Sequence, residues 1–248
     1  MQMTGAEVMV KCLAEEGVST VFGYPGGAIL PFYDALGESD IQHILVAHEQ
    51  GAAHAADGYA RASGKVGVCI ATSGPGATNL ITGLATAFLD SIPVVAITGQ
   101  VPKVMIGRDA FQEVDITGIA MPITKHNFLV KDPESLAQTL RLAFQMAKTG
   151  RPGPVLVDVP RDVQTALVDY VEGALPPVVE DEPSESDIAA AIAALAKAER
   201  PVMLIGGGVI SADAEYDAMY LCEKMHIPVV STLMGLGAIS AHRSLFLG

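Results

Sequence analysis

Short, continuous apolar runs alternate with longer amphipathic segments along the first 165 residues. The runs predict buried strands, because a strand covered on both faces carries apolar side chains at successive positions. We expect strands at residues 19–22, 42–46, 66–72, 93–98, 126–130 and 154–159. We expect helices at residues 28–36, 48–63, 77–89 and 133–148, after a first helix that Thr4 and Glu7 open with a capping box. This alternation predicts an α/β fold with a doubly wound parallel sheet.

Residues 166–184 depart from the pattern, since they are rich in proline and acidic side chains and so predict a linker. Apolar periodicity returns with a helix at 185–198, a strand at 201–205, a helix near 211–225 and a strand at 227–231. Two strands are too few to close a typical α/β domain. We therefore expect a domain at 1–165, a linker at 166–184, and the truncated beginning of a second α/β domain at 185–248.

Composition and charge exclude several functions. A net charge of −13 leaves no basic stripe for nucleic acid, and no run of about 20 apolar residues predicts a membrane span. Cys12, Cys69 and Cys222 stand far apart without a Cys/His cluster, so we expect no metal site. Unpaired cysteines and the lack of a signal peptide favour the cytoplasm.

Unusual residues follow four predicted strands in turn. They are GYPGG at 23–27, His48-Glu49-Gln50, TSGPGATN at 72–79, and TGQVP at 98–102 followed by residues 109–113. Ligands of open parallel sheets lie beyond the carboxyl ends of the strands. One glycine loop alone also fits an ordinary tight turn, but four on one edge indicate a ligand site. Neither GxxxxGK[ST] nor GxGxxG occurs in these loops, and no hydrolase elbow is visible.

Glu49 raises a specific question, because it begins a helix made almost wholly of alanine and glycine. An acid in the first turn also complements the helix dipole, which is one explanation of its presence. The small residues of 48–63, however, allow another backbone to come close. An acid in such a seam is poorly solvated, which favours the protonated form that donates a hydrogen bond. Glu49 is therefore a candidate catalytic group.

Several long runs closely resemble the acetohydroxyacid synthase (acetolactate synthase) large catalytic subunits, a thiamine-diphosphate-dependent family. The runs are GYPGGAILPFYDAL, VAHEQGAAHAADGYARASGKVGV, ATSGPGATNLITGLATAFLDSIPVVAITGQVP and DAFQEVDITGIAMPITKHNF. The resemblance covers residues 4–164 and resumes at RPVMLIGGG and PVVSTLMGLG. It implies that the first domain is the pyrimidine-binding domain of the family and that the second is its central, FAD-type domain.

The resemblance also implies roles for single residues. Glu49 would hydrogen-bond the aminopyrimidine ring of thiamine diphosphate, and Gln112 joins it as a catalytic residue. The other implied cofactor contacts are Tyr24, Pro25, Gly26, Gly27, Ser73, Gly74, Pro75 and Asn79, with Gly206, Gly207 and Gly208 for FAD. Ala28, Pro102, Phe111 and Lys125 would line the substrate channel.

The implied reaction decarboxylates pyruvate through the thiamine-diphosphate ylide and joins the two-carbon unit to a second 2-ketoacid, 2-ketobutyrate among them, in valine, leucine and isoleucine biosynthesis. The implied partners are a second copy, packed through helices 48–63 and 77–89, and a regulatory subunit. The family's GDG…N motif for Mg²⁺ and diphosphate is absent from this sequence. We therefore expect a fragment that is inactive alone. The alternatives are a non-catalytic dimerisation or assembly module, half of a split enzyme, and a nicotinamide-linked dehydrogenase.

Overall fold

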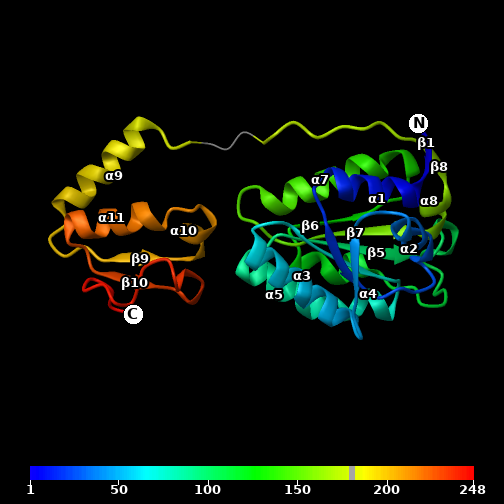
Figure 1. The fold of residues 1–248 in the computed structure, drawn as a ribbon, viewed down its shortest axis with the longest axis horizontal. Coiled ribbons are helices and arrows are strands. Elements are labelled where there is room, and N and C mark those ends of the chain that lie inside the picture. Colours follow the sequence, from blue (N-terminus) through cyan, green and yellow to red (C-terminus); the bar gives the residue numbers. More distant parts are fainter. Residues whose placement is uncertain (179–181) are drawn as a thin grey trace. The chain divides into compact units, whose positions relative to one another are not determined.

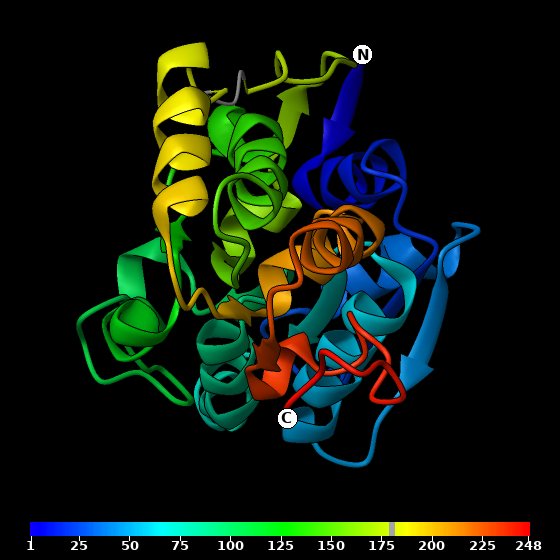
Figure 2. The ribbon, with the colours of Figure 1, turned by 90° about the vertical axis from the view of Figure 1, so that its left-hand side faces the viewer.

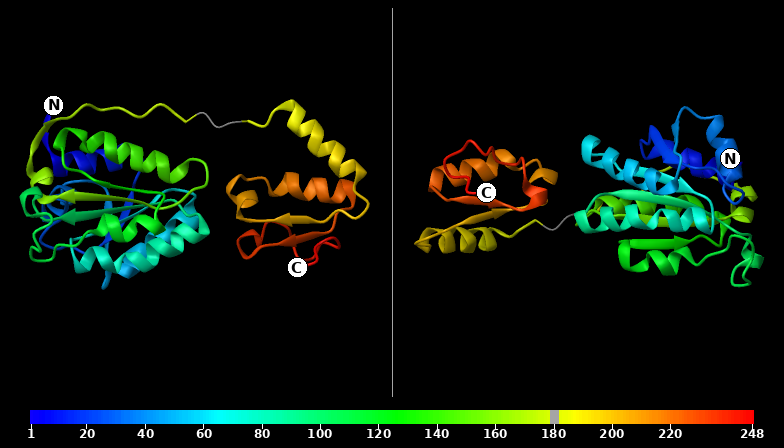
Figure 3. Two further views of the ribbon diagram at one scale, coloured as in Figure 1. Left: turned by 180° about the vertical axis from the view of Figure 1, so that it is seen from behind. Right: turned by 90° about the horizontal axis from the view of Figure 1, so that it is seen from below.

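The computed structural model describes residues 1–178 and 182–248. Its contacts form two units, one of residues 1–178 and one whose described residues are 182–248. The first unit contains the large sheet, with helices on both faces, and is drawn in blue to yellow-green in Figures 1 and 3. Residues 179–181, which fall within the predicted linker, lie outside the described residues.

The first unit is built on a six-stranded sheet in the order β3-β2-β4-β5-β7-β6. All of its strand pairs are parallel, for example Cys69 beside Ala96 and Ala96 beside Leu156. The strands are β2 (Thr20–Gly23), β3 (Gln42–Leu45), β4 (Gly67–Ala71), β5 (Val94–Gln100), β6 (His126–Leu129) and β7 (Val155–Pro160). The predicted α/β fold with a parallel sheet is confirmed.

Two layers of helices cover this sheet. One face packs against α1 (Gly5–Glu15), α2 (Leu30–Gly37), α7 (Leu136–Lys148) and α8 (Arg161–Thr165). The other face packs against α3 (Glu49–Ser63), α4 (Pro75–Asn79), α5 (Ile81–Asp90) and α6 (Ile116–Ala120). The capping box of Thr4 and Glu7 is present at the start of α1, as predicted.

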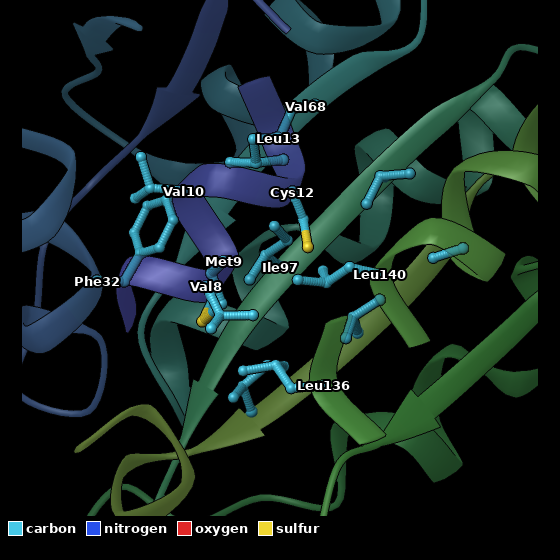
Figure 4. Close-up of a cluster of buried hydrophobic side chains, with 14 of the residues drawn as sticks. Val8, Met9, Val10, Cys12, Leu13, Phe32, Val68, Ile97, Leu136 and Leu140 are labelled. Atoms are coloured by element: carbon cyan, nitrogen blue, oxygen red, sulfur yellow. The ribbon is translucent and has the colours of Figure 1, made fainter. Parts of the chain in front are cut away.

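The two cores differ in side-chain size. Large residues fill the first, among them Met9, Leu13 and Phe32 (Figure 4). The second combines Leu80, Leu84 and Ile116 with alanines of α3, where Ala52, Ala53 and Ala56 are buried against β4 and α5. Because alanine side chains are small, the axis of α3 lies close to the sheet and to α5. This close packing fixes the position of Glu49, the first residue of α3.

Several elements differ from their predicted bounds. The helix expected at 77–89 is two helices, α4 and α5, which meet at Leu80. The strand expected at 93–98 extends to Gln100, and the connection from β5 to β6 includes α6 and the short 3₁₀ helices η1 (Lys103–Met105) and η2 (Met121–Ile123). The helix expected at 133–148 begins with η3 (Pro133–Ser135), a single 3₁₀ turn before α7.

The first unit continues beyond residue 165. Strand β8 (Leu167–Asp169) pairs antiparallel with β1 (Gln2–Thr4), and Tyr170 is buried in the core. Residues 167–170 thus lie on the first unit, although the sequence analysis assigns them to the linker. The sequence analysis does not predict β1 and β8, because each has only three residues and lies in no continuous apolar run.

The second unit pairs β9 (Met203–Ile205) with β10 (Val229–Ser231) in parallel. Its helices are α9 (Glu185–Lys197), α10 (Gly207–Ser211) and α11 (Glu215–Met225), with the 3₁₀ turn η4 (Leu233–Gly235) after β10. Figure 2 shows α9 in yellow and α11 in orange. A small core that includes Ile205, Cys222 and Val229 joins the strands to α11.

Candidate cofactor site at the carboxyl edge of the sheet

Strands β3, β2, β4 and β5 are consecutive neighbours in the sheet, and all end at the same edge. The GYPGG loop leaves β2, α3 begins after β3, TSGPGATN follows β4, and Pro102 lies two residues beyond β5. The parallel order therefore brings these predicted site segments to one edge, where ligands of such sheets bind.

The loops after β2 and β4 contact each other directly. The Ala28 amide donates to Thr72 Oγ1 at 3.2 Å, and the Tyr24 amide donates to the Ile70 carbonyl at 3.3 Å. A Cβ added at Gly26 would lie 2.5 Å from Thr72 Cγ2. Gly26 is needed for this close approach, which fixes Tyr24 and Pro25 beside the loop after β4.

Glu49 is the first residue of α3, and His48 caps this helix by accepting a hydrogen bond from the Gln50 amide. Its carboxyl group turns towards the loop after β4 and is half-buried. Asn79 Nδ2 donates to Glu49 Oε2 at 2.8 Å, and a Cβ added at Gly76 would lie 3.2 Å from Glu49 Oε1. Both carboxyl oxygens are therefore located against the segment that runs from Ser73 to Asn79.

The loop after β5 returns to this segment. Gly74 has φ +57°, and a Cβ at that position would lie 2.5 Å from the Gln112 carbonyl oxygen. Gln112 itself has φ +56°, which is unusual for a residue with a side chain. Its neighbour Phe111 is 87% exposed. The structure thus brings the backbone of Gln112 to the buried Ser73-Gly74 turn and leaves Phe111 projecting from the surface of this unit.

Lys125 lies at the opposite edge of the sheet, immediately before β6. Its ammonium donates to the Thr149 carbonyl at 2.7 Å and to the Met146 carbonyl, at the C-terminal end of α7. A cation there complements the helix dipole. Desolvation lowers the pKa of Lys125. Within this chain, Lys125 is not brought together with Glu49, and its channel role stays a prediction.

Gly206, Gly207 and Gly208 belong to the second unit, where Gly206 follows β9 and Gly207 and Gly208 begin the short α10. Gly206 and Gly207 lie beside the turn after β10, where a Cβ at Gly207 would be 3.1 Å from Met234 Cβ. This close contact accounts for one of the three glycines by packing. Their predicted FAD contact stays a prediction.

Sequence reasoning misses a buried polar cluster beneath the loop after β5. Asp158 is 1% exposed, and it accepts hydrogen bonds from Thr98 Oγ1 at 2.6 Å and Gln100 Nε2 at 2.9 Å. Burial raises the pKa of Asp158 to about 7, although the hydrogen bonds from Thr98 and Gln100 oppose the shift. The sequence indicates this cluster only by one acidic residue, Asp158, inside the otherwise apolar strand Val155–Pro160.

Across 1–178 and 182–248, no group of three or more His, Cys, Asp or Glu side chains could hold a metal ion. Within the same residues, no helix combines the length and the apolar character needed to cross a membrane.

The parallel sheet, with an acid and glycine loops at its carboxyl edge, places the first unit among the α/β domains that bind ligands at this edge. Comparison with known families makes this specific. Residues 3–119 match the family model described as "Thiamine pyrophosphate enzyme, N-terminal TPP binding domain", and residues 188–248 match "Thiamine pyrophosphate enzyme, central domain". The chain belongs to the thiamine pyrophosphate enzyme family.

Within that family the chain is similar to acetolactate synthase large subunits, as the sequence analysis predicts. It is 55% identical to the probable acetolactate synthase large subunit of Methanocaldococcus jannaschii, over 99% of this chain and 43% of the relative. It is 53% identical to the isozyme 2 large subunit of Escherichia coli, over 99% of this chain and 45% of the relative. The Corynebacterium glutamicum large subunit is 52% identical, over 100% of this chain and 40% of the relative. The chain thus spans less than half the length of these relatives.

Proposed function

We propose that this chain supplies the pyrimidine side of a thiamine-diphosphate site in an acetolactate synthase, with Glu49 as the residue that exchanges a proton with the cofactor ring. The position of the Glu49 carboxyl group carries this proposal. It is half-buried, held on one oxygen by Asn79, and directed on the other towards Gly76. The side-chain-poor segment from Ser73 to Asn79 lies against both oxygens of this carboxyl group.

The residues present suit this cofactor. Its aminopyrimidine ring needs one carboxyl partner at a ring nitrogen and apolar or glycine surfaces beside it, and the carboxyl edge of this sheet offers both. When bound, thiamine diphosphate supplies an electron sink for decarboxylation of a 2-ketoacid. Glu49 would hold a proton at the pyrimidine nitrogen, and Asn79 would fix the carboxyl orientation through its 2.8 Å hydrogen bond.

The proposed substrates are 2-ketoacids, which would reach Glu49 through a channel. Pyruvate and a second 2-ketoacid, 2-ketobutyrate among them, would enter past Ala28, Pro102 and Phe111, and Gln112 would contact the reacting groups. The product would serve branched-chain amino-acid synthesis in the cytoplasm. The close contact between the backbone of Gln112 and Gly74 supports the proposed role of Gln112.

Other partners would complete the site. A second copy would pack on α3 and α5, where Gly51, Gly58 and the 73% exposed Leu89 leave a surface of small and apolar residues. Mg²⁺ and the diphosphate would be held by residues outside this chain, and FAD by the glycines after β9. A regulatory subunit is a further proposed partner.

The proposal is tested by complementation. The chain is mixed with the C-terminal part of the Methanocaldococcus jannaschii relative that follows the matched region, and acetolactate formation from pyruvate is measured with thiamine diphosphate and Mg²⁺. We expect negligible turnover by the chain alone, turnover by the mixture, and a loss of about 100-fold or more with Glu49→Gln, in line with general acid–base catalysis.

Matched controls separate this function from its alternatives. Glu15→Gln alters another half-buried carboxyl group, on α1, and should retain the activity of the mixture. A folded, associated mixture that makes no acetolactate would favour a non-catalytic assembly module. Binding of NAD by the chain would instead favour a dehydrogenase.

A further inference from the structure

A buried polar cluster joins the ends of β5 and β7. Asp158 Oδ1 accepts from Thr98 Oγ1 at 2.6 Å, and Asp158 Oδ2 accepts from Gln100 Nε2 at 2.9 Å. All three side chains are 3% exposed or less. A carboxyl group buried at the centre of a sheet is costly unless its oxygens are bonded. Each carboxyl oxygen of Asp158 accepts a hydrogen bond within the cluster, so the acid fixes the orientations of Thr98 and Gln100.

Gln100 connects the cluster to both ends of one loop. Its Oε1 accepts from the Val101 amide at 2.9 Å, and its Nε2 donates to the Val114 carbonyl at 3.0 Å, besides donating to Asp158. Val101 and Val114 are the first and last residues of the segment 101–114. The Gln100 amide therefore closes the base of this loop, and Asp158 fixes the orientation of the amide.

The same loop is also closed near its tip. The Glu113 carboxylate accepts from the amides of Ala110, at 2.8 Å, and Gly107. These backbone hydrogen bonds lower the pKa of Glu113. Asp109 and Gln112 both have left-handed backbone conformations, with φ of 53° and 56°. Such conformations persist where the surroundings enforce them, and they gather at functional sites.

We propose that Asp158 is a positioning residue that acts through Gln100: it locks the base of loop 101–114 and so holds Gln112 against the Ser73-Gly74 turn and presents Phe111. The inference rests on the proposed function for the roles of Gln112 and Phe111. Asp158 itself lies beneath the loop, and the proposal gives it no contact with substrate or cofactor.

The geometry explains why an acceptor is required at position 158. The Gln100 amide uses both of its donors and its acceptor, so it stays in this orientation only if residue 158 accepts a hydrogen bond. An asparagine can accept from Gln100 with its oxygen and donate to the Thr98 hydroxyl with its nitrogen. A leucine of similar size offers neither group. Asp115, the residue that follows this loop, is a charged neighbour that helps to raise the pKa of Asp158.

The first test follows the loop directly by amide hydrogen exchange of the chain. Gln100→Met and Asp158→Leu should speed exchange within 101–114 by about tenfold or more, as expected when buried hydrogen bonds are lost. Asp158→Asn should stay within about twofold of the unchanged chain, because it keeps the bond to Gln100. Glu15→Gln, the control, should leave this loop unchanged. Gln100→Met also covers the case in which Asp158→Leu does not fold.

The second readout separates positioning from mere stability. In the complemented enzyme, Gln100→Met should lower kcat/KM for pyruvate by about tenfold or more while the affinity for thiamine diphosphate stays unchanged, and Asp158→Asn should retain kcat/KM. Unchanged exchange of 101–114 in Gln100→Met would overturn the inference, as would a loosened loop with unchanged kcat/KM. A mixture that forms no acetolactate would instead count against the proposed function. The hydrogen-exchange data would still show whether Asp158 and Gln100 hold the base of loop 101–114.

Discussion

At the scale of single residues, two carboxyl groups of the first unit lie in different surroundings. Glu49 is half-buried at the rim of the sheet and has one side-chain donor, Asn79. Asp158 is enclosed by β5 and β7 and has two donors, Thr98 and Gln100. A rim carboxyl group can meet a ligand and exchange a proton with it, whereas an enclosed one can only orient its protein neighbours.

The burial of Asp158 predicts a pH-dependent stability with a definite sign. Its pKa is about 7 when folded against 3.8 in the unfolded chain, so between these values the folded state binds more protons. The contribution of this group to the free energy of unfolding therefore falls by at most about 4 kcal/mol as pH rises from about 4 to about 7. Above pH 7 this contribution is constant.

Urea unfolding at several pH values checks this prediction. The difference in unfolding free energy between the unchanged chain and Asp158→Asn should decrease from pH 4.5 to pH 7, because asparagine does not titrate. The pKa of Asp115 is lowered by its bonds to Gly118 and Thr117, so its own contribution changes below this window. Parallel stability curves for the two proteins would show that Asp158 titrates elsewhere.

At the scale of elements, the six strands of the large sheet and most helices are predictable from apolar runs, and so is the gathering of glycine loops at one edge. Glu49 was found because its helix is conspicuously poor in side chains. The role of Asp158 was not predictable, because its partners Thr98 and Gln100 come from another strand. The resemblance implies a channel role for Lys125, and the structure shows its ammonium at the C-terminal end of α7. Contacts between distant segments leave no local pattern.

The segment after residue 165 offers an element-scale prediction. Tyr170 donates its hydroxyl to Glu15 on α1, and Arg141 on α7 donates to the Tyr170 hydroxyl at 3.0 Å. Tyr170→Phe removes both bonds while keeping the ring buried. Thermal or urea unfolding should show a loss of about 1–2 kcal/mol, and Glu15→Gln should lose less in the Tyr170→Phe background. Additive losses would show that this network does not hold residues 167–170 on the first unit.

At the scale of the whole molecule, the chain contains two units that match successive domains of one enzyme family. The first unit offers the carboxyl-bearing edge of its large sheet, and the second offers a small parallel pair with a glycine turn. Because the curated relatives are more than twice as long, the activity is expected to need residues beyond these two units. The central proposal therefore concerns the first unit, where Glu49 would contact the cofactor.

The central proposal is that Glu49 lies beside the pyrimidine ring of thiamine diphosphate. Saturation-transfer NMR tests this contact most directly, because the method detects weak binding of the cofactor by the chain alone. With thiamine diphosphate in excess, we expect saturation to reach the pyrimidine protons more strongly than the thiazolium protons. Glu49→Gln should reduce this transfer severalfold, and Glu15→Gln should leave it unchanged. Equal transfer in the unchanged chain and in Glu49→Gln, or transfer confined to the thiazolium ring, would contradict the account.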